Sequence, residues 1–158
     1  MGHSATNATA ADQLDDQFRS LLEGLRTTLP GVQVLFAFLL TLPLLPAFDR
    51  LTTAERWGFA IAFFGSALAS VLLIAPSVHQ RVRAPISGIR RRDPSHIRAA
   101  VRLAISGTIA FIVALVAAVY LISSLIMPVP SLTVIATSAI AGVAGWAWFY
   151  MPLVQFRD

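Results

Sequence analysis

The chain has no cysteine and no lysine, and it has few charged residues of any kind. Without cysteine it can form no disulfide, thiolate metal site or cysteine nucleophile, and it has no thiol for lipid attachment. Charged residues make up 13% of its 158 residues, about half the usual share for a soluble domain. Hydrophobic residues make up 56%, and the mean hydropathy is +0.73. These values indicate one compact membrane domain.

Ionisable residues are missing altogether from the long stretch Leu103–Phe156. A helix of about 20 apolar residues spans the hydrocarbon core of a bilayer, so this stretch is too long for one span. Pro128 and Pro130 interrupt it once. Proline removes a backbone donor and clashes with the preceding turn. The stretch therefore predicts two membrane helices joined by a very short turn.

The whole chain predicts an all-α fold, an integral membrane four-helix bundle. The spans are expected at about residues 30–48, 57–78, 94–126 and 131–154. Thr52 and Glu55 have the spacing of a capping box, so they should begin the second span. Pro43 should kink the outer end of the first span.

An N-terminal amphipathic interfacial helix is predicted at residues 12–29, after a disordered tail over residues 1–11. Its apolar residues recur at helical spacing and form one stripe: Leu14, Phe18, Leu21, Leu22, Leu25 and Leu29. Its acidic residues outnumber its basic ones, which disfavours binding to anionic lipid. We expect this helix to dock on the basic loop of the protein itself. Residues 155–158 are expected to form a short C-terminal tail.

Arginine is concentrated between the second and third spans. The basic loop contains Arg81, Arg83, Arg90, Arg91 and Arg92. Because arginine is retained on the cytoplasmic side, we expect both termini and this loop to face the cytoplasm of a bacterial inner membrane. The expected partners of the loop are anionic lipid headgroups, and not nucleic acid.

The hydrocarbon part of each predicted span lacks Asp, Glu, Lys, Arg and His. Proton relays and cation sites in pumps normally need such groups at depth. The sequence also has no metal-ligand spacing, no phosphate-binding loop and no Ser-His-Asp set of the kind found in enzymes. We therefore predict a protein without enzymatic activity, cofactor or metal site.

One set of polar and aromatic residues should come together at the cytoplasmic ends of the spans. Its members are Gln33, Ser77, His79, Arg98, Arg102, Ser106, Trp146, Trp148 and Tyr150. One interpretation is an ordinary aromatic belt with arginines meeting lipid phosphate. The other is a small polar pocket that binds a headgroup or another anion.

Small residues recur at intervals of four along the last three spans, which predicts close helix packing. The rows are Gly58, Ala62, Ser66 and Ser70; Ser106, Ala110, Ala114 and Ala118; Ser138 with Gly142; and Thr137, Ala141 and Gly145. A row that is not used within the chain could contact a second copy of it.

Three segments, Leu29–Thr41, Ile74–Arg81 and Gly145–Phe149, resemble a family of small four-span membrane proteins of unknown function. This family is common in actinobacteria, and its members are often labelled sodium:proton antiporters. The resemblance covers about residues 21–153. It implies the four-span topology and no established activity.

We predict a non-enzymatic accessory, assembly or lipid-interacting factor of the membrane. Its expected partners are membrane lipids, and a second copy or an unidentified membrane protein. The alternative is a secondary transporter of the sodium:proton antiporter type. Its ion path would be built from Gln33, Thr41, Ser66 and Ser70 together with backbone groups.

Overall fold

The computed structural model describes residues 2–83, 94–150 and 154, and this part of the chain is helical with no strand. The long helices are α1 (Gly2–Thr41), α2 (Thr53–Arg83), α3 (Pro94–Ile126) and α4 (Pro130–Gly145). The short ones are η1 (Leu42–Leu44), η2 (Pro46–Arg50) and the π-helix η3 (Trp146–Tyr150). All four long helices contain a segment long and apolar enough to cross a membrane. The predicted all-α fold with four spans is confirmed.

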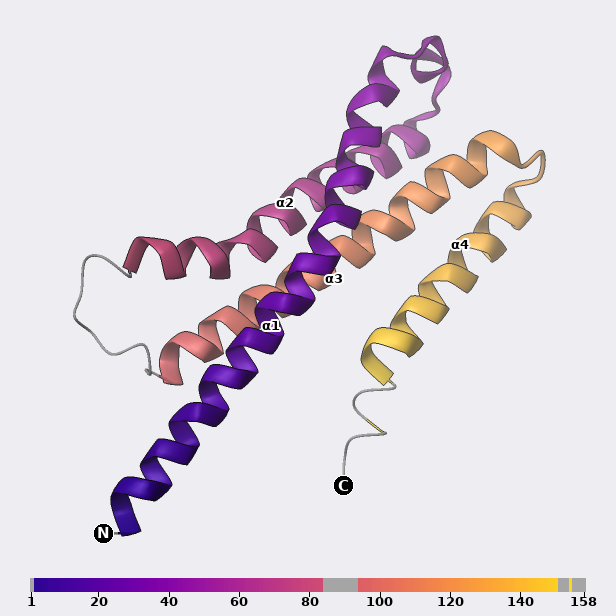
Figure 1. Cartoon of the computed structure of the whole chain (residues 1–158). Helices are drawn as coiled ribbons and strands as arrows, with labels where there is room; N and C mark the ends of the chain where they lie inside the picture. The colour runs from indigo at the N-terminus through magenta and orange to yellow at the C-terminus, as the bar shows by residue number, and fades with distance from the viewer. Residues whose placement is uncertain (1, 84–93, 151–153, 155–158) are drawn as a thin grey trace.

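The antiparallel helices α2 and α3 form the central pair (Figure 1). A Cβ atom built on Gly65 would lie 3.1 Å from Cβ of Ala114, and one built on Gly107 would lie 2.8 Å from Cγ of Leu73. Lipid supplies no hydrophobic drive for helix association, so this close contact between small residues is what holds the pair together.

The predicted packing rows agree with this pair in part. On α2, Gly58, Ala62 and Ser66 are buried, as expected. On α3, Ala114 and Ala118 are also buried. Ser106, however, is exposed, and Gly107 takes the packed position beside it. One residue along a helix turns the side chain by about 100°, so the row on α3 was assigned slightly off the contact face.

Helix α1 packs across the central pair along one seam of apolar side chains (Figure 1). Leu25, Val32 and Leu39 are buried at intervals of seven. The first two lie in one core cluster with Ala69 and Leu73 of α2 and Ala104 of α3. Seven residues are about two helical turns, so these three side chains lie on one face of α1.

The continuous helix α1 corrects our prediction for the N-terminal part of the chain. We predicted a disordered tail over 1–11, a separate helix over 12–29 and a span from residue 30, whereas residues 2–41 form one helix. The described part of the apolar stripe, Leu22, Leu25 and Leu29, continues in register into Val32. It therefore packs against the other helices of the bundle. Pro30 lies on the exposed side of α1, where its ring does not disturb that seam.

The segment after α1 turns the chain back toward α2. We expected the first span to reach residue 48, but the α-helix ends at Thr41 and two short 3-10 helices follow. Pro43 and Pro46 each lie in the first turn of one of them. Because proline cannot donate a helical hydrogen bond, two prolines this close end the helix and do not merely kink it.

The predicted capping box at the start of α2 is confirmed. The backbone N–H of Thr52 donates to the Glu55 carboxylate at 2.7 Å, and the Thr52 hydroxyl donates to the same oxygen at 2.9 Å. In return, the backbone N–H of Glu55 donates to the Thr52 hydroxyl oxygen at 3.4 Å. These bonds satisfy backbone donors that a helix start leaves free.

We expect Glu55→Ala to lower the free energy of unfolding by about 1 kcal/mol, the usual effect of losing a helix cap. Unfolding in mixed micelles, followed by circular dichroism, measures this change. Asp49→Ala is the matched control because Asp49 is an exposed carboxylate of the same turn that has no place in the cap. An equal loss of stability in both variants would contradict the assignment.

Helix α2 continues to Arg83, so Arg81 and Arg83 belong to its last turns and not to a loop. No glycine or proline interrupts the sequence between Pro76 and Arg83. Arg90, Arg91 and Arg92 lie outside the described residues, and so does the contact that we predicted between them and residues 12–29.

Helix α4 packs on α3 and, within the described part of the chain, on no other long helix (Figure 1). It begins at Pro130, next to the predicted residue 131, and continues into η3 after Gly145. A Cβ atom added to Gly142 or Gly145 would meet nothing within 4 Å. Gly142 and Gly145 therefore make no close helix contact within the described part of the chain. The predicted tail over 155–158 lies outside the described residues.

Candidate functional site

The charged side chains that the structure describes lie toward the two ends of the bundle. Leu25, Leu73 and Ala104 share one buried cluster, so their neighbours Arg26 and Arg102 lie at a similar depth. Asp49, Arg50, Glu55 and Arg56 mark the other end. About 20 helical residues, or about 30 Å, separate the two levels on α3. We call the uncharged region between them the apolar slab, and its thickness matches the hydrocarbon core of a bilayer.

At the end that carries Asp49 and Arg50, the side chain of Arg56 fastens η2 to the start of α2. Its guanidinium donates to the backbone oxygen of Leu51 at 3.3 Å and to that of Asp49 at 3.4 Å. It also lies over the ring of Phe48, 5.7 Å from the centroid. The N–H donors and the charge of Arg56 thus stabilise the turn between η2 and α2.

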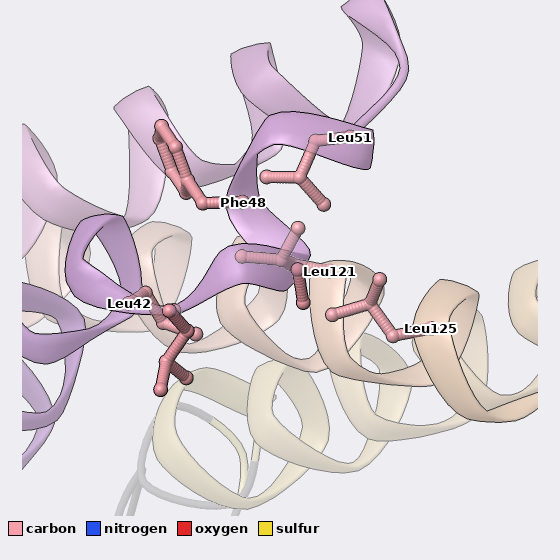
Figure 2. Close-up of a pocket in the computed structure, with 7 residues that line it drawn as sticks. Leu42, Phe48, Leu51, Leu121 and Leu125 are labelled. Carbon is pink, nitrogen blue, oxygen red and sulfur yellow. The ribbon is translucent and has the colours of Figure 1, made fainter.

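The same end contains a small apolar pocket (Figure 2). Figure 2 shows Leu42, Phe48 and Leu51 from the turn facing Leu121 and Leu125 of α3. Leu45 and Ala47 complete its lining. Because no lining residue carries an ionisable or polar side chain, this pocket can hold apolar groups but offers no group for catalysis.

The other end, which carries Arg26, Arg98 and Arg102, is the arginine-rich end. On α3, Arg98, Arg102 and Ser106 follow one another at intervals of four and are all exposed. This spacing puts them on one face of the helix. The buried residues Ala100, Ala104 and Gly107 lie on the opposite face, toward α2 and α1. We call the exposed set the arginine row; it points out of the bundle at the edge of the apolar slab.

The other members of the predicted polar set are not gathered around the arginine row. Ser77 is half-buried and His79 is exposed near the end of α2. Gln33 is exposed on α1, outside the packing seam. Within the described part of the chain, no hydrogen bond joins two members of the set. The structure therefore shows an outward-facing distribution and not one shared pocket.

The aromatic members lie in η3, directly after α4. Trp148 stacks on Phe111 of α3, with ring centroids 6.1 Å apart. Phe111 is nine residues from Arg102, about 13 Å along the helix, so this tryptophan lies within the apolar slab. Trp146 and Tyr150 lie in the same π-helix and are exposed.

The residues proposed for an ion path do not line one channel. Gln33 and Thr41 are exposed on α1, whereas Ser66 is fully buried on α2. The hydroxyls of Thr41, Ser66 and Ser70 each donate to a backbone oxygen of their own helix, at 2.7, 2.9 and 3.0 Å. Each of these hydroxyls is hydrogen-bonded within its own helix, and the three do not converge on a common point.

Among the residues that the structure describes, no three of His, Cys, Asp or Glu come close enough to hold a metal ion. The apolar pocket was not anticipated from the sequence. The apolar segment Leu42–Phe48, which contains two prolines, was the signal that could have suggested a folded turn there.

Comparison with known protein families gives one match. The model of a family of unknown function, DUF6328, matches residues 7–152 of the chain. Comparisons with curated proteins and with solved structures find no match.

Proposed function

The chain belongs to DUF6328, a family of unknown function, and we propose that it is a non-enzymatic accessory or assembly factor of the membrane that binds anionic lipid headgroups at its arginine-rich end. The observation that carries the proposal is the outward orientation of the arginine row. An arginine that faces out at the edge of an apolar slab meets the phosphate layer of the surrounding bilayer.

The geometry of the arginine row suits a phosphate group. Side chains four residues apart on a helix lie about 5–6 Å from each other, so Arg98 and Arg102 can approach one phosphate together. Guanidinium groups bind phosphate oxygens through paired hydrogen bonds. Ser106, one turn deeper, has a hydroxyl at the level of the ester groups of the same lipid.

We further propose that this end faces the cytoplasm of a bacterial inner membrane, because arginine is retained on that side. The N-terminal end of α1 and the C-terminal end of α4 lie at the same end of the structure (Figure 1). Four spans would place both termini in the cytoplasm. The sodium:proton antiporter alternative has less support because its proposed residues do not share a path.

We expect the double variant Arg98→Gln/Arg102→Gln to bind phosphatidylglycerol about 30-fold more weakly, since each arginine near the surface contributes about 1 kcal/mol to binding anionic lipid. Native mass spectrometry of the protein with phosphatidylglycerol and phosphatidylcholine in competition measures this preference. Arg50→Gln is the matched control because Arg50 is exposed at the opposite end. An unchanged preference for phosphatidylglycerol in the double variant would contradict the proposal.

A further inference from the structure

Gln33 places a polar amide on the outside of α1, inside the apolar slab. It is exposed and lies about 100° around α1 from the buried Val32, outside the packing seam. It is seven residues from Arg26, which is about 10 Å along the helix. From that depth a glutamine side chain is too short to reach the phosphate layer.

The amide of Gln33 has no hydrogen-bond partner among the described residues. An amide has two donors and one acceptor oxygen, and hydrocarbon chains offer it nothing to bond. Leaving it unpaired in hydrocarbon carries the full cost of removing it from water. The hydroxyls of Thr41, Ser66 and Ser70 differ from this amide, because each of them bonds to its own helix.

We propose that the exposed face of α1 around Gln33 is the contact surface between two copies of this chain. Two copies inserted in the same orientation are related by a two-fold axis perpendicular to the membrane, which brings each residue on the axis to its own counterpart at the same depth. An amide both donates and accepts, so Gln33 is complementary to Gln33 of the partner subunit.

The rest of this face allows two helices to approach. Ala37, one turn from Gln33 on the same side of α1, is small and exposed. Glu23 and Arg26 are exposed where α1 leaves the slab. Their opposite charges can pair across the axis, so the ends of the two helices attract each other.

The pairing of α1 with α1 is favoured over pairing through α4. Gly142 and Gly145 also leave open space on α4, but small residues alone do not require a partner. Gln33 does, because its amide is exposed in hydrocarbon without a partner in the described part of the chain. The surface is separate from the arginine row, so self-association does not depend on the proposed lipid binding.

The lack of native cysteine makes a cross-linking test specific. Ala37→Cys is compared with Val113→Cys in membranes treated with copper phenanthroline. Both residues are exposed, and each is eleven residues from the arginine that marks the edge of the slab, Arg26 on α1 and Arg102 on α3. We expect disulfide-linked dimer to form at least about tenfold faster at residue 37. Equal or absent cross-linking at the two positions would overturn the proposal.

The amide itself is tested by Gln33→Leu and Gln33→Asn. Loss of an interhelical hydrogen bond in a membrane weakens association by about tenfold, so the leucine variant should show that loss and the asparagine variant should keep most of the affinity. Energy transfer between labelled copies in liposomes, diluted with lipid, gives the dimer fraction. An undiminished dimer in Gln33→Leu would overturn the proposal, as would a disulfide from residue 37 to another protein and not to a second copy. Should Gln33→Leu fail to fold, the comparison of residues 37 and 113 decides the matter.

Discussion

Gly107→Ala is expected to destabilise the protein by about 1–3 kcal/mol, the usual cost of inserting a methyl group into a tightly packed contact. The added Cβ would lie 2.8 Å from both Cγ and Cδ2 of Leu73 and 3.1 Å from Cβ of Leu72. Leu73 is fully buried and cannot move aside freely. Gly107→Leu should separate α2 from α3 and prevent stable folding.

The same change at Gly142 is the matched control because a Cβ atom there would meet nothing within 4 Å. Replacing glycine by alanine inside a helix otherwise gains about 1 kcal/mol, so Gly142→Ala should leave stability unchanged or raise it. Unfolding in mixed micelles, followed by far-ultraviolet circular dichroism, compares the two variants. The proposed packing is contradicted if both substitutions shift the unfolding midpoint in the same direction by the same amount.

Reporters fused after Asp49 and after Arg92 should give opposite signals, periplasmic for the first and cytoplasmic for the second. Of the twelve arginines, only Arg50 and Arg56 lie on the side assigned to the periplasm. Such a bias fixes the orientation of insertion because arginine resists translocation. Alkaline phosphatase should be active after Asp49 and inactive after Arg92, and green fluorescent protein should show the reverse.

The variant Arg50→Gln/Arg56→Gln should keep this orientation, since the excess of arginine at the other end remains. That variant is the control for a local effect of the fusion point. The orientation is refuted if both fusion points report the same compartment or if the two signals are exchanged.

The membrane spans could be predicted because they depend on the absence of charge and on helix-breaking residues, which are both local properties of the sequence. Helix α3 has the predicted bounds at both ends, and α4 begins one residue from the predicted position. The N-terminal helix was predicted less well. An amphipathic stripe at the membrane surface and a packing seam have the same helical period, so the pattern of Leu22, Leu25 and Leu29 could not distinguish them.

The sequence predicted only roughly at which depth each residue of the candidate site lies, and it did not predict which way its side chain points. The sequence placed Gln33, Arg102 and Trp148 near one end of the bundle, but convergence also depends on how each helix is rotated about its axis. That rotation is fixed by tertiary packing, as in the contact of Gly107 with Leu73. Arg102 faces outward because Ala104 and Gly107, on the other side of α3, are the residues that fit against the neighbouring helices.

The apolar slab also relates this protein to the thickness of the bilayer around it. Because α2 and α3 are in close contact through Gly65 and Gly107, they cannot slide to change the distance between the charged ends. A bilayer with longer acyl chains would therefore create a hydrophobic mismatch, which is relieved by thinning of the surrounding lipid or by helix tilt. Helix α4, held by α3 alone among the long helices that are described, is the one that can tilt most easily. The central pair thus has a fixed hydrophobic length, which suits membranes with a hydrocarbon core of about 30 Å.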